Sequence, residues 1–66
     1  MIVFVNGERR EVGDPATLDQ VLGLGGAAPR GFAVAVDGSV VPRAQHRSTT
    51  LHEGARVEVV TAVQGG

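Results

Sequence analysis

Two residue pairs, Asn6-Gly7 and Asp37-Gly38, constrain this chain more than any other feature, because each is a strong signal for a two-residue β-hairpin turn. Asn and Asp tolerate positive φ and Gly adopts it without strain, and a type I′ turn requires positive φ at both central positions. An apolar run precedes each pair, and a second segment of strand character follows it. The sequence therefore predicts two hairpins. The predicted strands are residues 1–5, 8–12, 32–36 and 39–41.

One short helix is predicted between the two hairpins. Thr17 is typical of a helix N-cap, and Gln20, three positions later, completes a capping box. The apolar stripe at helical spacing consists of Leu18, Val21 and Leu22. Gly23 and the glycines after it are expected to end this helix within about two turns. A helix this short is not stable alone, so it must pack on a sheet.

A last strand is predicted at residues 56–63, and the first and last strands are the most apolar segments of the chain. That composition favours a central position and a parallel pairing of the two. Alternation places one set of side chains inward: Phe32, Val34, Val36, Val57 and Val59. Leu51 is expected to join this core. These features together predict an α+β fold of the β-grasp (ubiquitin-like) class, a mixed sheet of about five strands with one short helix across one face.

The charge balance excludes two classes of partner. Six basic residues, all of them Arg, oppose seven acidic ones, for a net charge of −1. We therefore expect neither nucleic acid nor a membrane surface as a partner. The apolar runs reach only about five residues, against the ~20 that a membrane span needs. Because the sequence shows no signal-peptide pattern either, a cytoplasmic location is expected.

Catalytic and metal chemistry also lack a basis in the sequence. The chain has no cysteine, and its histidines, His46 and His52, lie six positions apart in a polar segment. A zinc site needs at least three protein ligands, so we expect no metal site and interpret both histidines as solvated loop residues. No serine lies in a nucleophile elbow or beside a paired base. The sequence therefore indicates that the chain is not itself an enzyme.

The final residues, Gly65 and Gly66, are the sharpest functional feature. We expect residues 1–63 to form one β-grasp domain and residues 64–66 a flexible tail. Two residues without Cβ can extend through a narrow slot in a partner and deliver the terminal carboxylate to a reactive group. A frayed end is the alternative interpretation.

A partner surface is a further possibility on the sheet face opposite the helix. If Val3 and Val5 point toward the helix, Phe4 points away from it, and Val60 is expected to lie beside it on the neighbouring strand. An open apolar patch often marks a partner surface, although scattered apolar residues on a surface are also ordinary.

Taken together, these residues resemble the ThiS family, the sulfur carrier proteins of thiamine biosynthesis. The likeness extends over essentially the whole chain. It rests on Asn6-Gly7, Thr17, residues 31–38, Val41-Pro42-Arg43, Leu51, residues 53–55, residues 57–60 and Gly65-Gly66. Two departures stand out. The family often has an aromatic residue just after the Pro-Arg element, where this chain has Ala44-Gln45-His46. The related molybdopterin-pathway carrier is usually longer, with a proline-rich stretch before its glycines, whereas this chain has Thr61-Ala62-Val63-Gln64 there.

The resemblance implies a carrier cycle centred on Gly66. In this family a ThiF-like enzyme uses ATP and magnesium to adenylate the terminal carboxylate, so the carrier itself binds no cofactor. A cysteine desulfurase system then supplies sulfur to form a thiocarboxylate, and a ThiG-like thiazole synthase takes the sulfur. Arg43 is either a docking or scaffold residue or an ordinary loop charge.

Other functions stay open at this point. A sulfur carrier of this type can serve molybdopterin or cysteine formation instead. A ubiquitin-like protein modifier would use the same adenylation and transfer its tail to lysines of other proteins. A non-covalent adaptor would use the Phe4 face and would not need Gly65 and Gly66.

Overall fold

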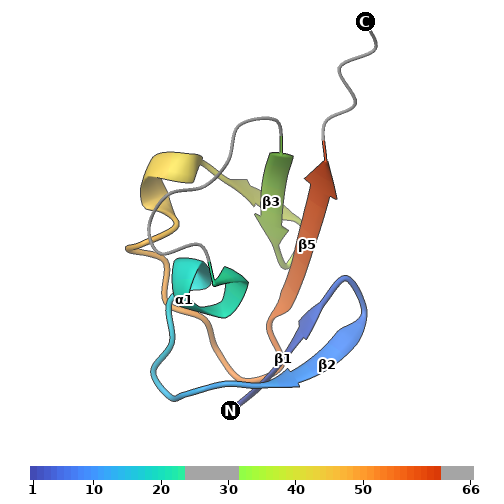
Figure 1. Ribbon diagram of the computed structural model, residues 1–66, viewed down its shortest axis with the longest axis vertical. Helices are drawn as coiled ribbons and strands as arrows, with labels where there is room; N and C mark the ends of the chain where they lie inside the picture. The colour runs from blue at the N-terminus through green and yellow to red at the C-terminus, as the bar shows by residue number, and fades with distance from the viewer. Residues whose placement is uncertain (24–31, 62–66) are drawn as a thin grey trace, which may run out of the picture.

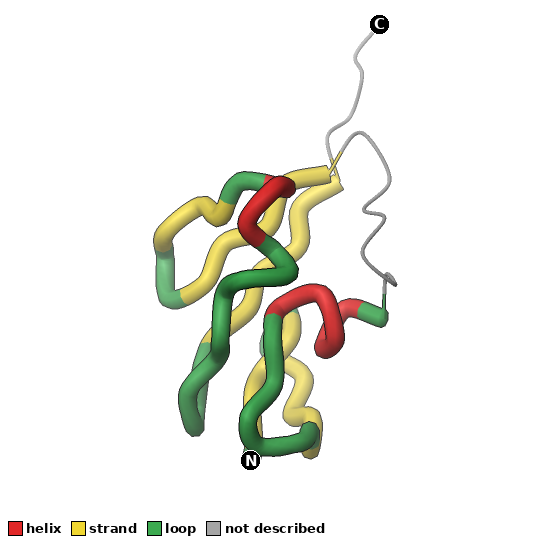
Figure 2. The backbone as a smooth tube through the Cα atoms, turned by 90° about the vertical axis from the view of Figure 1, so that its left-hand side faces the viewer, coloured by secondary structure: helices red, strands yellow, loops and turns green. Residues whose placement is uncertain are grey.

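The computed structural model describes residues 1–23 and 32–61, and for Phe32 and Thr61 it describes the backbone alone. These residues form one mixed β-sheet with a short helix across one face (Figure 1, Figure 2). The elements in chain order are β1 (Ile2–Val5), β2 (Glu8–Glu11), α1 (Leu18–Leu22), β3 (Phe32–Val36), β4 (Ser39–Val41), the 3₁₀ helix η1 (Arg43–Gln45) and β5 (Arg56–Thr61). The predicted α+β fold of the β-grasp class is confirmed.

The strand order is β2-β1-β5-β3-β4, so β5 lies at the centre of the sheet (Figure 1). β1 and β5 pair in parallel, with Phe4 opposite Arg56 and Val5 opposite Val57, as the apolar character of both segments predicted. The other three pairings are antiparallel. All four residues of the edge strand β2 are exposed, and their charges disfavour pairing with another chain.

Both predicted hairpin turns are present. Asn6 and Gly7 have φ values of 51° and 81°, and Asp37 and Gly38 have 50° and 86°. Positive φ at both central positions is the signature of a type I′ turn, whose twist matches that of the flanking strands. These turns set the registers of β1 with β2 and of β3 with β4.

Helix α1 begins and ends as predicted. The Thr17 N–H donates to Oε1 of Gln20 at 2.9 Å, which is the return hydrogen bond of the capping box. At the other end Gly23 adopts φ of 70°, and its N–H donates to the Asp19 carbonyl at 3.0 Å. The helix has only five residues, so its stability comes from packing.

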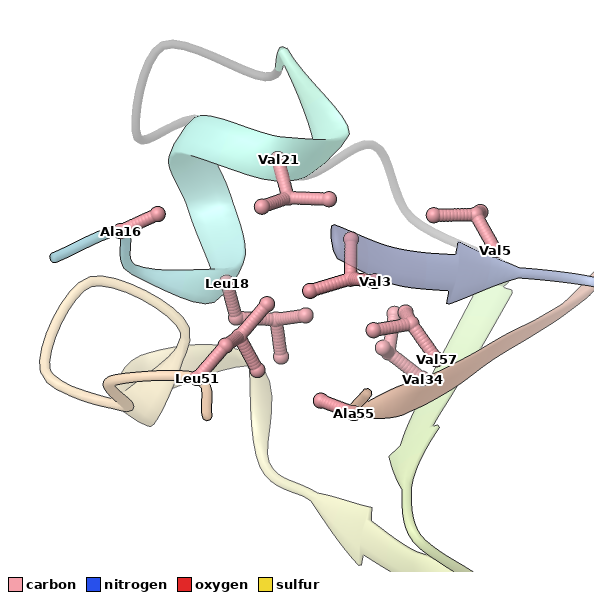
Figure 3. Close-up of a cluster of buried hydrophobic side chains, with 9 residues drawn as sticks. All are labelled: Val3, Val5, Ala16, Leu18, Val21, Val34, Leu51, Ala55 and Val57. Atoms are coloured by element: carbon pink, nitrogen blue, oxygen red, sulfur yellow. The ribbon is translucent and has the colours of Figure 1, made fainter. Parts of the chain in front are cut away.

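The core lies between α1 and the sheet (Figure 3). Leu18 and Val3 are fully buried at its centre, and the predicted burial of Leu51 is confirmed. Of the side chains predicted to point inward, Val34 and Val57 are buried and Val36 and Val59 are partly buried. The Phe32 side chain and residues 62–63 of the predicted last strand lie outside the described residues. Among the residues whose side chains the structure describes, the buried core consists of Val3, Val5, Ala16, Leu18, Val21, Val34, Leu51, Ala55 and Val57.

Candidate functional site

The candidate site begins at the end of β5, the strand that precedes Gly65 and Gly66 in the sequence. β5 pairs with β3 from Phe32 opposite Thr61 to Val36 opposite Val57, and with β1 on its other side. Val57 is 1% exposed, which anchors the strand in the core. Gly65, Gly66 and the predicted tail of residues 64–66 lie outside the described residues. The structure therefore provides a firmly held strand whose last described residue is Thr61.

An exposed apolar strip crosses the sheet face opposite α1. Val60 on β5 and Val40 on β4 are 62% and 71% exposed. Ala33 lies opposite Val60 and Ala35 lies opposite Val40, so these four side chains share the outer face. We call Val60, Ala33, Ala35 and Val40 the outer strip. The outward orientation of Val60 was predicted, whereas Val40 was missed, although the alternation of residues 39–41 was a signal for it.

Phe4 lies on the same outer face but not beside Val60, so that expectation is wrong. The parallel register places Phe4 opposite Arg56, and its partner on β2 is Arg9. Val60 is four residues farther along β5 than Arg56, about 13 Å at the rise of a strand. Phe4 instead lines an open cavity of about 650 Å³ together with Asn6, Gly7, Arg56, Val57 and Glu58.

Arg43 opens the 3₁₀ helix η1 directly after Pro42 and is exposed. β4 ends at Val41, which is opposite Val34, and Val34 in turn is opposite Val59. This register places η1 at the same end of the sheet as the end of β5, which Figure 1 shows as the upper end of the view. The structure thus brings Arg43 toward the Val60 end of the outer strip and leaves Phe4 at the other end.

His46 is buried, so its interpretation as a solvated loop residue is wrong. Its side chain is 4% exposed, and Nε2 lies 3.1 Å from the Val41 carbonyl oxygen, to which it donates. Nδ1 is buried without a hydrogen-bond partner among the described residues. His46 is buried because η1 turns the chain inward at this residue. The His46 carbonyl also accepts a hydrogen bond from the Asp19 N–H at 3.1 Å. His46 therefore links β4 to the start of α1.

His52 is exposed, as predicted, but it is not free in solvent. Its Nε2 pairs with the Asp37 carboxylate, and its Nδ1 lies 2.8 Å from the Glu53 carbonyl oxygen. The same carboxylate accepts a hydrogen bond from the Arg56 N–H at 3.0 Å. The pKa of Asp37 is lowered by the Arg56 N–H first and by His52 second. The pKa of His52 is raised by its hydrogen bond to Asp37 first and by the Glu53 carbonyl second.

Two further properties concern the described part of the chain only. Residues 1–23 and 32–61 contain no group of three or more His, Asp or Glu side chains placed to hold a metal ion. Within the same residues, no helix has the length and apolar character required to cross a membrane.

Comparisons with known proteins agree with this geometry. The ThiS family model matches residues 3–66. A crystal structure of the thiamine biosynthesis protein ThiS from Geobacter metallireducens is similar at a TM-score of 0.79 and 26% identity, with 100% of both chains covered. An NMR solution structure of a thiamine biosynthesis protein from the same organism is similar at a TM-score of 0.70 and 26% identity, covering 100% of this chain and 88% of that one. A comparison with curated protein sequences finds no match.

Proposed function

The chain belongs to the ThiS family, and we propose that it is a sulfur carrier of thiamine biosynthesis that bears the sulfur as a thiocarboxylate on Gly66. The observation that carries this proposal is the extent of the family match, which runs through the two final glycines to residue 66. The central strand β5 supports it, because this strand, paired with β1 at Arg56 and Val57 and with β3 as far as Thr61, ends only five residues before Gly66.

The proposed chemistry requires activation of the terminal carboxylate. A carboxylate is a poor acceptor for a sulfur nucleophile until one of its oxygens becomes a good leaving group. We propose that a ThiF-like enzyme, using ATP and magnesium, joins the Gly66 carboxylate to AMP with release of pyrophosphate. Sulfur from a cysteine desulfurase system, reduced to the sulfide level by a thiol that is oxidised to a disulfide, then attacks the carbonyl carbon and AMP departs, leaving a thiocarboxylate. A ThiG-like thiazole synthase receives the sulfur.

The chain contributes a carrier group and a rigid base for it, and its enzymes contribute the catalysis. Gly65 and Gly66 carry no Cβ, so they fit a narrow active-site channel. The chain has no lysine, so no side-chain amine of its own competes for the activated carboxylate.

We further propose that the activating enzyme docks on the outer strip near Arg43. The strip is apolar and exposed. Its Val60 end and Arg43 both lie at the end of the sheet where β5 approaches Gly66 in sequence. Exposed apolar area of this kind often marks a partner surface. Arg43 has no ion-pair partner among residues 1–23 and 32–61, which leaves its guanidinium available to a carboxylate of the enzyme.

The decisive experiment is intact-mass spectrometry of the chain after incubation with the ThiF-like enzyme, ATP, magnesium, a cysteine desulfurase, cysteine and a thiol reductant. The expected result is the mass gain of one oxygen replaced by sulfur, located on the C-terminal fragment. A chain lacking Gly66 serves as the first control and should not gain mass. Gly65→Ala keeps the carboxylate and adds one Cβ, so it should react more slowly. No mass gain of the intact chain, with enzymes active on another carrier, would contradict the proposal.

The same reaction mixture distinguishes a sulfur carrier from the main alternative, a protein modifier. A protein modifier would form isopeptide bonds to lysines, so it would appear as a ladder of heavier adducts when a cell extract is added. The sulfur carrier is expected to give the thiocarboxylate and no such ladder.

A further inference from the structure

The backbone groups of β5 alternate between its two neighbours. The Asp37 N–H donates to the Arg56 carbonyl at 2.8 Å, so Arg56 belongs to a hydrogen-bonded pair of the β3–β5 ladder. In an antiparallel ladder every second residue faces the partner strand in this way. The main-chain groups of Val57, Val59 and Thr61 therefore face the β1 side. The Asn6 N–H confirms this for Val57, since it donates to the Val57 carbonyl at 2.8 Å.

β1 does not continue far enough to pair all of these groups. It ends at Val5, and the chain then turns back at Asn6 and Gly7. The Asn6 side chain extends the ladder by one bond, because its Oδ1 accepts from the Val59 N–H at 2.8 Å. The Val59 carbonyl and the Thr61 N–H come next along this edge. Among residues 1–23 and 32–61, the pairing of β1 with β5 stops at Val57 and neither group faces β3, so neither has a partner in the sheet.

We call the Val59 carbonyl and the Thr61 N–H, on the β1 side of β5, the open edge. Figure 1 shows the arrangement: β3 flanks the upper half of β5 on one side, while the β1–β2 hairpin reaches only the lower half on the other. The 650 Å³ cavity lined by Phe4, Asn6 and Glu58 lies at the hairpin turn, below the bond from the Val59 N–H to Asn6. The open edge thus presents two main-chain groups without a sheet partner among the described residues.

The length of chain after β5 restricts what can cover the open edge. Five residues separate Thr61 from the end at Gly66. Fully extended, they reach about 18 Å at most. An enzyme that receives the Gly66 carboxylate in an enclosed site must therefore place part of its own surface against the end of β5. The open edge lies at that end.

We propose that the open edge is a strand-addition site, occupied by an extended segment of the enzyme that activates the terminal carboxylate. An incoming strand accepts from the Thr61 N–H and donates to the Val59 carbonyl, which continues the sheet on the side that β1 leaves free. The identity of the occupant rests on the proposed function, whereas the position of the site rests on the hydrogen-bond pattern of β5.

Amide hydrogen exchange tests this proposal without any substitution. In the free chain the Thr61 N–H should exchange much faster than the Val60 N–H, which faces β3. Bound to the ThiF-like enzyme, the Thr61 N–H should slow by at least about tenfold. Unchanged exchange at Thr61 in a saturated complex would overturn the proposal. Slowing that appears at high carrier concentration without enzyme would also overturn it, because the occupant would then be a second copy of this chain.

A matched pair of variants tests how much the Thr61 N–H contributes to binding of the activating enzyme. Thr61→Pro removes the N–H of the open edge and leaves the β3 ladder intact, since this N–H does not face β3; edge positions tolerate proline. Thr61→Val keeps the N–H and serves as the control. In pyrophosphate exchange with the ThiF-like enzyme, Thr61→Pro should raise the KM for the carrier about tenfold, because its partner acceptor is left unpaired. Thr61→Val should stay within about twofold of wild type.

Equal KM values for the two variants, with both chains folded by circular dichroism, would overturn strand addition and leave the sulfur-carrier function intact. If the wild-type chain does not support pyrophosphate exchange with an enzyme active on another carrier, the proposed function itself fails. The inference about the occupant then fails with it. The wild-type reaction is measured first, so the two failures are distinguishable.

Discussion

His52 and Asp37 join two segments that are fifteen residues apart, the β3–β4 hairpin turn and the segment that leads into β5. Nε2 of His52 faces the Asp37 carboxylate, and Nδ1 faces the Glu53 carbonyl. Both partners only accept hydrogen bonds, so both ring nitrogens must carry a hydrogen. The arrangement therefore selects the imidazolium form of His52.

The first prediction is a pH dependence of this contact. Since the pKa of His52 is raised above its ordinary 6.5, its contribution to stability is fully present below pH 6.5 and lost as pH rises through the raised pKa. The pKa of Asp37 is lowered, so its contribution is present above pH 3.8 and lost as pH falls. NMR titration of the His52 ring should show the raised pKa. Asp37→Asn keeps an acceptor for Arg56 and should return the pKa of His52 toward 6.5.

A second prediction concerns Asn6, which combines φ of 51° with the hydrogen bond to the Val59 N–H. Asn6→Ala should lower the free energy of unfolding by about 1–2.5 kcal/mol, because it loses the bond and because alanine, without the short polar side chain of asparagine, tolerates the left-handed region poorly. Asn6→Gly keeps the backbone conformation and should lose only about 1 kcal/mol, the contribution of the bond. Urea unfolding measures both. An equal loss of unfolding free energy in the two variants would contradict a separate cost of the left-handed backbone conformation at residue 6.

A third prediction concerns the core. Leu18 is fully buried in the contact of α1 with the sheet (Figure 3). Leu18→Ala should cost about 2–5 kcal/mol, through lost burial and the cavity left behind. In a domain this small, that loss approaches the whole stability. Leu18→Met conserves volume and should cost under about 1.5 kcal/mol. Thermal unfolding followed by circular dichroism compares the two, and a small effect of Leu18→Ala would argue against this packing.

A fourth prediction distinguishes the two histidines. His46→Ala should cost about 2–3 kcal/mol, because it opens a cavity and removes the hydrogen bond from His46 to the partly buried Val41 carbonyl. His52 is exposed, so His52→Ala should leave the free energy of unfolding nearly unchanged at a pH above the raised pKa of His52, where the imidazole is neutral. Urea unfolding at that pH measures both variants. The reverse order of effects would contradict the positions of the two side chains.

The fifth prediction tests the outer strip as a docking surface. Val60→Arg should leave the unfolding temperature nearly unchanged, because the side chain is 62% exposed. It should raise the KM for the carrier in pyrophosphate exchange by about tenfold or more, since it places a charge in an apolar contact. Arg10→Ala changes an exposed residue of the edge strand β2, far from this strip, and serves as the control. The same KM for both variants would exclude docking at Val60.

Local signals in the sequence made much of this fold predictable. Asn6-Gly7 and Asp37-Gly38 specify their turns through backbone conformation alone, and Thr17 caps its helix within one turn. Alternation along β5 separates buried Val57 from exposed Val60 without reference to any other strand. The resemblance to the ThiS family likewise rests on residues that are legible in sequence, and the family match confirms it.

The sequence by itself therefore determined the elements, their inward and outward faces and the family, because each depends on neighbours along the chain. Tertiary structure decided what depends on segments distant in sequence. The parallel register separated Phe4 from Val60, and η1 buried His46 against the start of α1. The early end of β1 left the open edge at Thr61. Register and burial of this kind follow from how both packed surfaces fit together, and neither segment carries that information alone.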